Sequence, residues 1–277
     1  MWNILRQIRT VTSEMATKPK GLLIDLTKCV GCRACVLGCR ELHGQPAEQP
    51  PRGYHVRGAY RSGDELTATS WTVIEDYNGK FVRRLCQHCA RPACVAACMV
   101  GALSKSALGP VVYDDKKCCG CRYCIQACPY QVPKYEWTKI VPYMRKCDMC
   151  FGRVSQGQQT QCAEVCPTGA TFFGERDALL EEAHKRLRDD PAYVQRIYGE
   201  AELGGTSVLY ITDVPFEKLG FITPPSDRPM PTLMAAGMEE SHSVVLIGGP
   251  LLAGLHWITQ RRRAVLLAEG KLPKNGK

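Results

Sequence analysis

Cysteine is missing from both ends of this chain. Its 277 residues contain 17 cysteines, all of them between Cys29 and Cys166. A small secreted scaffold held by disulfides is usually shorter and denser in cysteine than this. The odd count also argues against a framework made only of disulfides. Closely spaced cysteines confined to one region favour metal binding instead.

The chain also lacks the usual signs of a catalytic or exported protein. No catalytic base, nucleophile or phosphate-binding loop is recognisable in the sequence. The N-terminus carries Arg6 and Arg9 but neither an apolar core nor an adjacent arginine pair, so no secretory signal is expected. We therefore interpret residues 1–20 as an N-terminal tail.

Acidic charge is in deficit, since 36 Lys and Arg against 27 Asp and Glu give a formal net charge of +9. Such an excess can indicate nucleic acid or anionic lipid as a partner. Metal binding offers another explanation, because a four-iron centre held by four thiolates carries roughly −2. Four such centres would bring about −8 and leave the protein near neutral. Much of the basic excess is then counter-charge, and nucleic acid is not an expected partner.

The cysteines form four groups with a shared spacing. Each group begins with a two-residue gap and ends with a three-residue gap, and only the middle spacing varies. The groups are Cys29, Cys32, Cys35 and Cys39; Cys86, Cys89, Cys94 and Cys98; Cys118, Cys121, Cys124 and Cys128; and Cys147, Cys150, Cys162 and Cys166.

This spacing is typical of iron–sulfur proteins. The run C-x2-C-x2-C-x3-C is the bacterial ferredoxin signature, and its fourth cysteine ligates the other cluster of a pair. The sixteen grouped cysteines are therefore predicted to be iron ligands of four [4Fe–4S] clusters. Structural zinc also uses C-x2-C pairs with four ligands per ion, but it does not need the third cysteine at the same short spacing.

One cysteine lies outside the common register. Starting the third group at Cys118 gives gaps of two, two and three, whereas starting at Cys119 matches no other group. Cys119 occupies the position of Val30 and Gln87 in the first two groups, where no ligand is required. We predict that Cys119 is not a ligand and points into packing as a small apolar side chain.

The spacing of the groups suggests how they pair. Nineteen residues separate Cys98 from Cys118, so the second and third groups resemble one complete two-cluster ferredoxin. The first and fourth groups are then left to pair across it. With exchange of the fourth cysteine, the predicted sets are Cys29/Cys32/Cys35/Cys166, Cys39/Cys147/Cys150/Cys162, Cys86/Cys89/Cys94/Cys128 and Cys98/Cys118/Cys121/Cys124.

The predicted fold class is α+β, with two interleaved ferredoxin-like units carrying inserted hairpins. A strand is expected at 22–26, and Asn78–Gly79 is typical of a two-residue hairpin between 71–77 and 80–84. Further expected elements are hairpins over 102–113 and 134–145, a helix over 177–188, a strand over 208–212 and an extended linker over 215–231. The expected regions are a tail (1–20), a four-cluster domain (21–175), a helix, strand and linker (176–240), a transmembrane helix (241–260) and a basic tail (261–277).

The transmembrane prediction is based on residues 241–260, which contain no Asp, Glu, Lys or Arg. Twenty residues span about 30 Å as a helix, the thickness of a bilayer core. A helix docked on a partner is the alternative. The basic residues after Gln260 place the C-terminus in the cytoplasm, and the cluster domain is then on the periplasmic side. Export would depend on a partner that carries the signal. The role of His242 and His256, near the two ends of the span, is left open.

In its four groups and its tail, the chain resembles the iron–sulfur (beta) subunits of membrane-bound formate dehydrogenases and hydrogenase-2. Related subunits of nitrate reductase and dimethyl sulfoxide reductase complexes are similar. The resemblance implies a non-catalytic subunit that relays electrons from a catalytic molybdenum or tungsten subunit, or from a hydrogenase large subunit. The acceptor would be a membrane cytochrome b or quinone-binding subunit.

Two questions remain open at this point. Formate dehydrogenase and hydrogenase types are not distinguished by one chain, and a zinc-stabilised, membrane-tethered interaction module is the alternative of another class. Three histidines in polar segments, His43, His55 and His88, are expected to be surface or interface residues.

Overall fold

The computed structural model describes residues 18–45, 54–56, 59–63, 65–137, 143–223 and 227–271, with backbone alone for 54–56, 59–63 and 238–244. The chain divides into two units, Met1–Met230 and Pro231–Lys277. Most of the predicted N-terminal tail, the His55 and His242 side chains and the last six residues lie outside the described part.

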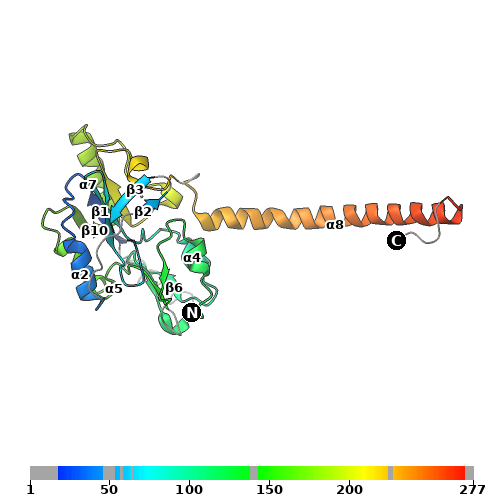
Figure 1. Ribbon diagram of the computed structural model, residues 1–277, viewed down its shortest axis with the longest axis horizontal. Helices are drawn as coiled ribbons and strands as arrows, with labels where there is room; N and C mark the ends of the chain where they lie inside the picture. Colours follow the sequence, from blue (N-terminus) through cyan, green and yellow to red (C-terminus); the bar gives the residue numbers. More distant parts are fainter. Residues whose placement is uncertain are drawn as a thin grey trace, which may run out of the picture. The chain divides into compact units, whose positions relative to one another are not determined.

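A three-stranded sheet is the centre of the first unit (Figure 1). Its middle strand, β1 (Lys20–Asp25), pairs antiparallel with β10 (Thr171–Glu175) and parallel with β11 (Val208–Ile211). Leu22 and Leu23, on opposite faces of β1, are both completely buried. The predicted strands at 22–26 and 208–212 are thus confirmed, and the sheet joins the residues just before the first cysteine group to those after the fourth.

One face of this sheet is covered by helix α7 (Arg176–Asp189), close to the predicted 177–188 (Figure 1). The buried side of α7 follows helical periodicity. It packs on Leu23, Leu209 and Ile211 through Leu179, Ala183 and Leu187. The four cysteine groups lie outside this cluster, which makes α7 a structural layer.

A second sheet is an antiparallel meander with the order β2-β3-β4-β5. Its strands are Tyr54–Val56, Ala59–Gly63, Val73–Tyr77 and Lys80–Arg84. The turn between β4 and β5 has positive φ at both Asn78 (54°) and Gly79 (87°), as a two-residue hairpin of this hand requires. The predicted hairpin is confirmed.

Two small hairpins complete the strands. β6 (Leu103–Lys105) pairs with β7 (Val111–Tyr113), and β8 (Lys134–Tyr135) pairs with β9 (Met144–Arg145). Both were predicted, although the described strands of the second are shorter than expected and residues 138–142 lie outside the described part.

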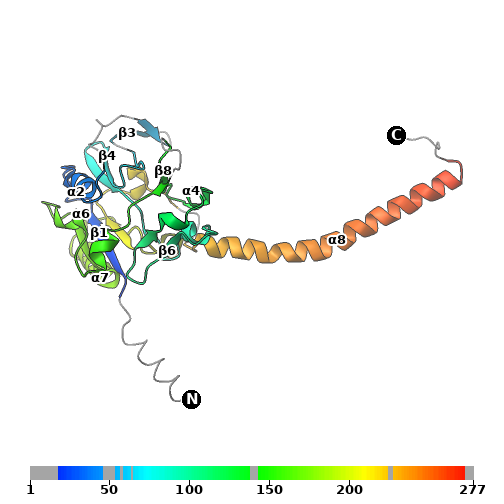
Figure 2. The same ribbon diagram turned by 90° about the horizontal axis from the view of Figure 1, so that it is seen from below.

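Short helices follow the cysteine loops and pack in pairs. They are α2 (Ala34–Leu42), α3 (Ala93–Ala96), α4 (Tyr123–Ala127), α5 (Phe151–Val154) and α6 (Gln161–Glu164). α2 packs against α6 (Figure 2), and α3 packs against α4. Helices of the first and fourth groups therefore meet, as do helices of the second and third, in agreement with the predicted pairing of the groups.

Residues 215–231 do not form the predicted extended linker throughout. A 3₁₀ turn, η3 (Phe216–Leu219), buries Phe216 and Leu219 to 2% exposure each. The ring of Phe221 lies 4.6 Å from that of Tyr198 and 5.0 Å from that of Tyr210. The proline-rich composition predicted an open segment, but aromatic burial fastens it to the core.

The second unit contains the long helix α8 (Met230–Ala268), except for Met230, which belongs to the first unit. A helix over 241–260 was expected and is present, with Ser241–Val244 outside the side chains described. In the described part of the chain, which leaves out the side chains of Ser241–Val244, no helix combines the length and apolar character needed to cross a membrane, and the span over 241–260 stays a prediction.

One ion pair fixes α7 to β1 and gives a test of the fold. Asp25 is fully buried and accepts from Arg186 Nη1 at 3.1 Å, while the Arg186 guanidinium lies 4.3 Å from the Phe172 ring. We expect Arg186→Gln to reduce the free energy of unfolding by about 2–3 kcal/mol, because it leaves a buried carboxylate without its cation. Denaturant unfolding would measure the change.

Arg188→Gln is the matched control, since Arg188 is exposed on the same helix. Its effect should stay within about 0.5 kcal/mol. Equal losses in the two variants would show that the Asp25 pair does not carry the helix–sheet contact.

Candidate metal centres

The four cysteine groups share one backbone turn. In each, the residue before the second cysteine has positive φ: Gly31 (70°), His88 (47°), Gly120 (74°) and Met149 (56°). This conformation is easy for glycine and costly for other residues. The turn curls the loop so that its thiols point to one side, and it recurs in groups where the sequence offers no glycine.

In the first and third groups the next turn is also alike. Arg33 (φ 63°) and Arg122 (φ 66°) take left-handed conformations as N-caps of α2 and α4. The third cysteine of each group, Cys35 or Cys124, is consequently the second residue of its helix. The repeated spacing in the sequence thus corresponds to a repeated loop-to-helix geometry.

Within each of the four predicted sets, the thiols act electrostatically on one another. Burial raises the pKa of Cys89, and Cys86, Cys128 and Cys94 raise it further. Burial also raises the pKa of Cys124 to about 11, with added contributions from Cys118, Cys121 and Cys98. We call these sets the Cys86 quartet and the Cys98 quartet.

The first and fourth groups give the other two sets. Burial raises the pKa of Cys29, and Cys166 and Cys32 add to the rise. Cys29 and Cys166 also add to the rise that burial causes in the pKa of Cys35. We call Cys29, Cys32, Cys35 and Cys166 the Cys29 quartet. The Cys39 quartet consists of Cys39, Cys147, Cys150 and Cys162. Burial raises the pKa of Cys39 to about 12, and Cys162 and Cys150 contribute to the rise. Burial also raises the pKa of Cys147, and Cys39 raises it further.

Electrostatic effects between thiols of different quartets indicate a row. In addition to burial, Cys162 of the Cys39 quartet raises the pKa of Cys35 in the Cys29 quartet. In the same way Cys86 raises the pKa of Cys147 in the Cys39 quartet, and Cys124 of the Cys98 quartet raises the pKa of Cys94 in the Cys86 quartet. The order along the row is therefore Cys29, Cys39, Cys86 and Cys98 quartet.

Two of the quartets line cavities. One cavity is lined by Cys29, Cys32, Cys35 and Cys166 together with apolar residues and Arg83. The other is lined by Cys98, Cys118, Cys121 and Cys124. Since all 17 cysteines are free thiols, these cavities are not closed by disulfides. Four converging sulfurs around an enclosed space fit a metal centre that deprotonates its ligands.

Backbone N–H groups favour charge on at least one thiol. Burial alone would raise the pKa of Cys166, but N–H groups of Thr171, Ala170 and Thr168 and the Thr168 hydroxyl lower it. Such donors stabilise a sulfur that carries negative charge and are a common outer layer of iron–sulfur sites.

Buried cations lie along the row, as the charge balance led us to expect for part of the basic excess. Arg83 is 2% exposed, donates to Thr72 and Thr171, and has its pKa raised by Cys162 and Cys35 against the lowering effect of burial. The sequence analysis did not single it out, although its place three residues before Cys86 is a signal.

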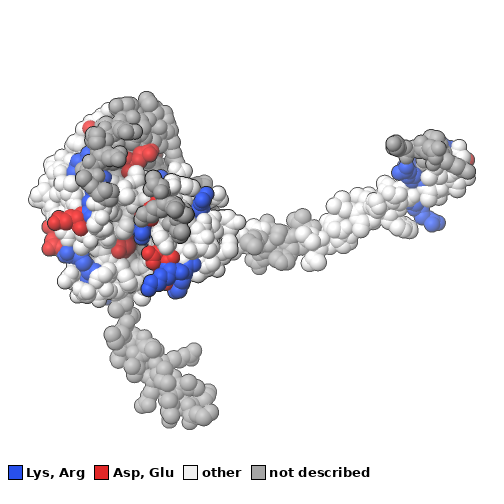
Figure 3. All heavy atoms as spheres, turned by 60° about the horizontal axis from the view of Figure 1, so that its bottom comes forward, with Lys and Arg blue, Asp and Glu red and all other residues white. Residues whose placement is uncertain are grey.

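Two lysines extend this pattern. Lys146, next to Cys147, is 5% exposed and donates to the Cys147 carbonyl at 3.0 Å. Lys105 donates to the His88 carbonyl at 2.8 Å, and burial lowers the pKa of Lys105 to about 8 against the raising effect of Cys89. Many other charged side chains are on the surface, where both signs are interspersed on the face shown in Figure 3.

Two predictions about individual residues are wrong. His88 is fully buried rather than at the surface, and its Nδ1 accepts from the Val111 N–H at 2.9 Å. Cys119 is exposed rather than packed inside, at the edge of the cavity of the Cys98 quartet. His43 is half-buried, with its ring 4.4 Å from Trp71, and His256 is exposed.

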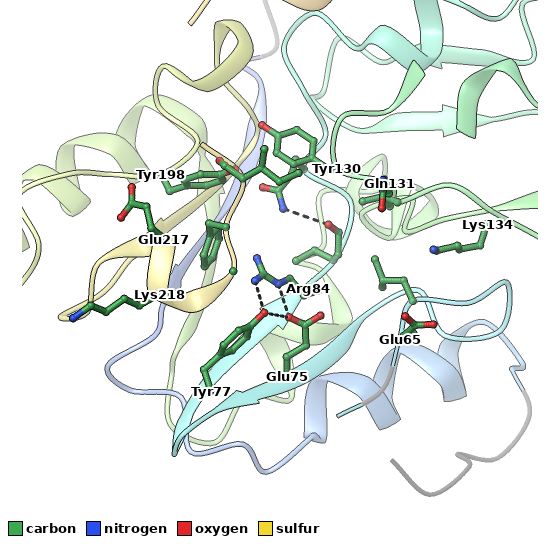
Figure 4. A pocket seen from close by; sticks show the side chains of 17 residues that line it. Glu65, Glu75, Tyr77, Arg84, Tyr130, Gln131, Lys134, Tyr198, Glu217 and Lys218 are labelled. Carbon is green, nitrogen blue, oxygen red and sulfur yellow. Dashed lines mark hydrogen bonds and ion pairs between the residues drawn. The ribbon is translucent and has the colours of Figure 1, made fainter. Parts of the chain in front are cut away.

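A pocket of about 300 Å³ opens beside the Cys86 quartet (Figure 4). Leu85 and Gln87, which flank Cys86, line it, as does Tyr130, two residues after Cys128. On its wall Arg84 donates to Glu75 at 2.8 Å and to Tyr77 at 3.2 Å (Figure 4). A ligand or partner side chain in this pocket would contact both segments that carry thiols of the quartet.

The shared turn is testable at Gly31. A Cβ on Gly31 would lie 2.6 Å from the Phe81 ring, in addition to the strain of an alanine at φ 70°. We expect Gly31→Ala to bind less metal than the unmodified chain and to unfold at a lower temperature, because the loop that carries Cys29 and Cys32 must shift. Metal analysis and thermal unfolding would measure both effects.

Gly44→Ala is the control, since Gly44 has φ 57° but no atom within 4 Å of an added Cβ. It should cost only the strain of left-handed alanine, about 1–2 kcal/mol, and leave the metal content unchanged. Metal loss of the same size in both variants would contradict a special role for the Gly31 turn.

Comparison with known proteins agrees with this geometry. Residues 77–176 match the 4Fe-4S dicluster domain family. The chain is 37% identical to a protein of Nitratidesulfovibrio vulgaris (strain Hildenborough) over 257 residues, which is 90% of this chain and 69% of that protein.

Two further relatives are each 36% identical to this chain. Hydrogenase-2 operon protein HybA of Escherichia coli O157:H7 is 36% identical over 239 residues, 72% of this chain and 71% of HybA. The iron-sulfur subunit of the nitrate-inducible formate dehydrogenase of Escherichia coli K12 is 36% identical over 217 residues, 74% of this chain and 70% of that subunit. The chain therefore belongs to the family of iron–sulfur proteins that includes HybA and the formate dehydrogenase iron-sulfur subunits.

Proposed function

We propose that this chain relays electrons through four [4Fe–4S] clusters, one in each cysteine quartet. The observation that carries the proposal is the row of four quartets, in which a thiol of each acts on a thiol of the next. A [4Fe–4S] cluster takes up and releases single electrons when it is bound. Four of them in a row would form a path from one surface of the protein to another.

The proposed ligands are the sixteen grouped cysteines, with Cys119 excluded. Their burial supports the assignment, because burial raises the pKa of thiols such as Cys94 and Cys39 to about 12, and such thiols keep their protons at neutral pH unless a metal displaces them. Metal binding would displace these protons and hold the four sulfurs of each quartet together.

The other residues of the row have binding and electrostatic roles. Arg83, Lys105 and Lys146 place positive charge beside three of the quartets and offset the negative charge of thiolates and sulfide. Apolar neighbours exclude water, which reduces the reorganisation that accompanies each electron transfer.

We propose that a separate catalytic subunit supplies the electrons. The relatives include both a hydrogenase-2 operon protein and formate dehydrogenase subunits at the same 36% identity. The proposed donor is accordingly a molybdenum or tungsten formate dehydrogenase subunit, with a hydrogenase large subunit as the alternative. Mass spectrometry of the large subunit that co-purifies with the chain would decide between them.

The proposed acceptor is an integral membrane subunit that binds haem b or quinone. The described part of α8 exposes apolar side chains, among them Leu246 (73%) and Leu251 (61%), followed by the basic cluster Arg261–Arg263 (blue on the helix in Figure 3). Such a surface suits contact with a membrane subunit at an interface with anionic lipid. The basic residues after Gln260 favour a cytoplasmic C-terminus in this arrangement.

Metal analysis tests the function directly. Anaerobically purified protein should contain about sixteen irons per chain and show the broad visible absorption of iron–sulfur clusters. A colourless protein that holds only zinc would overturn the proposal and favour a zinc-stabilised interaction module.

The ligand register is tested at two adjacent cysteines. Cys118→Ala should lose or convert one cluster, because it removes a thiol of the Cys98 quartet. Cys119→Ala is the matched control and should keep all four clusters, since Cys119 lies outside the spacing that the four groups share. EPR spectra and iron content would report both, and the reverse pattern would show that Cys119 is the ligand.

A further inference from the structure

The cavity of the Cys98 quartet contains two tyrosines in addition to its thiols. Tyr113 at the end of β7 and Tyr135 in β8 both line it with the four cysteines. We call them the tyrosine pair. Each comes from one of the hairpins inserted around the third cysteine group, so neither belongs to the ferredoxin spacing itself.

The hydroxyl oxygens of the tyrosine pair are buried, and neither forms a hydrogen bond within the described part of the chain. A buried hydroxyl without a partner is unfavourable, since it has lost its bonds to water. An acceptor in the cavity would remove this cost.

The position of Tyr135 points to a sulfur acceptor. Its Oη lies 3.0 Å from where a Cβ on Gly120 would stand, so the hydroxyl is directly over the loop that joins Cys118 to Cys121. Burial raises the pKa of both tyrosines, and the Cys118 thiol raises it further, as expected of a sulfur that lies close to each hydroxyl. Thiolate and sulfide sulfurs are acceptors for such donors.

Both rings are held in place from behind. Leu103 pairs with Tyr113 across the β6–β7 hairpin, and both belong to one apolar cluster with Tyr135 and Met144. Arg122 lies 5.5 Å from the Tyr135 ring and 4.5 Å from the Trp137 ring, so it stacks over this wall of the cavity. Fixed rings aim the hydroxyls at the cavity instead of at solvent.

We propose that the tyrosine pair donates hydrogen bonds to sulfur of the cluster in the Cys98 quartet and thereby raises its reduction potential. The inference rests on the proposed function, which provides the cluster. A hydrogen bond to sulfur stabilises the reduced cluster more than the oxidised one, because the reduced form carries more negative charge. Tyr113 and Tyr135 are thus positioning and tuning residues rather than ligands.

Another quartet is built differently. The cavity of the Cys29 quartet is lined by Arg83 and threonines, with no tyrosine among its described lining residues. Loss of the tyrosine pair should therefore affect one cluster of the four.

The test uses the full chain with the variants Tyr113→Phe, Tyr135→Phe and the double variant. EPR signals followed during a potentiometric titration give the midpoint potential of each cluster. We expect one of the four potentials to fall in each single variant and to fall further in the double variant. The iron content and the other three potentials should stay at their unmodified values.

Tyr193→Phe is the matched control. Its hydroxyl donates to Asp25 at 3.0 Å, and its ring packs with the α7 cluster of Leu23 and Leu187. It should leave all four potentials unchanged. Variants of the tyrosine pair that hold full iron and keep all four potentials would overturn the proposal.

A second measurement detects the hydrogen bond itself. In pulsed EPR, an exchangeable proton that is coupled to one cluster in the unmodified chain should be missing from the double variant, and exchangeable-proton signals that are the same in both proteins also overturn the proposal. A chain without iron gives no cluster signal at all and contradicts the proposed function instead, so the two failures are distinguishable.

Discussion

The structure depends on bringing four sulfurs together in each quartet, most of them wholly or partly buried. Burial alone makes a thiolate costly, as the raised pKa of Cys35 (about 11) and Cys94 (about 12) indicates. Four thiolates in one cavity would also repel each other. A metal centre resolves both problems, because it takes the ligands' negative charge and holds the sulfurs at bonding distance. The left-handed turns, the short helices and the buried cations all follow from this requirement.

The requirement also explains how distant parts of the chain come to pair. The Cys29 quartet needs a thiol from Cys166, so the chain must return to its first loop after more than a hundred residues. The sheet makes this return possible, since β10, which starts five residues after Cys166, lies beside β1, which ends four residues before Cys29. Helices α2 and α6 then pack, with Gly38 giving room to Val165. Core packing and ligand assembly therefore support each other.

How far the sequence predicts this site depends on whether a feature is local. The cysteine spacing, the Asn78–Gly79 hairpin and the α7 helix are local patterns, and each is present in the structure. The left-handed turn was foreseeable at Gly31 and Gly120 but not at His88 and Met149, whose strained φ only the surrounding fold enforces.

Tertiary features were missed for the same reason. His88 is surrounded by polar sequence, yet it is fully buried because Lys105 and Val111 close over it. Phe216 follows a proline in a segment that appeared to be open, and it is buried by aromatic rings contributed by distant residues. The register of Cys119 came from comparing the groups, but register does not determine exposure, which depends on where the fold places that side of the loop.

The two ends of the row differ in the kind of stabilisation that surrounds the sulfurs. Arg83 brings a full positive charge to the Cys29 and Cys39 quartets, and Lys146 and Lys105 do so near the Cys86 quartet. A charge acts over several ångströms in a low dielectric and so affects more than one cluster. The hydroxyls of Tyr113 and Tyr135 are neutral dipoles, whose effect is confined to an atom in contact. Arg122 also lines the cavity of the Cys98 quartet, so a positive charge lies near all four quartets, and the tyrosine hydroxyls add a short-range contribution at the last one.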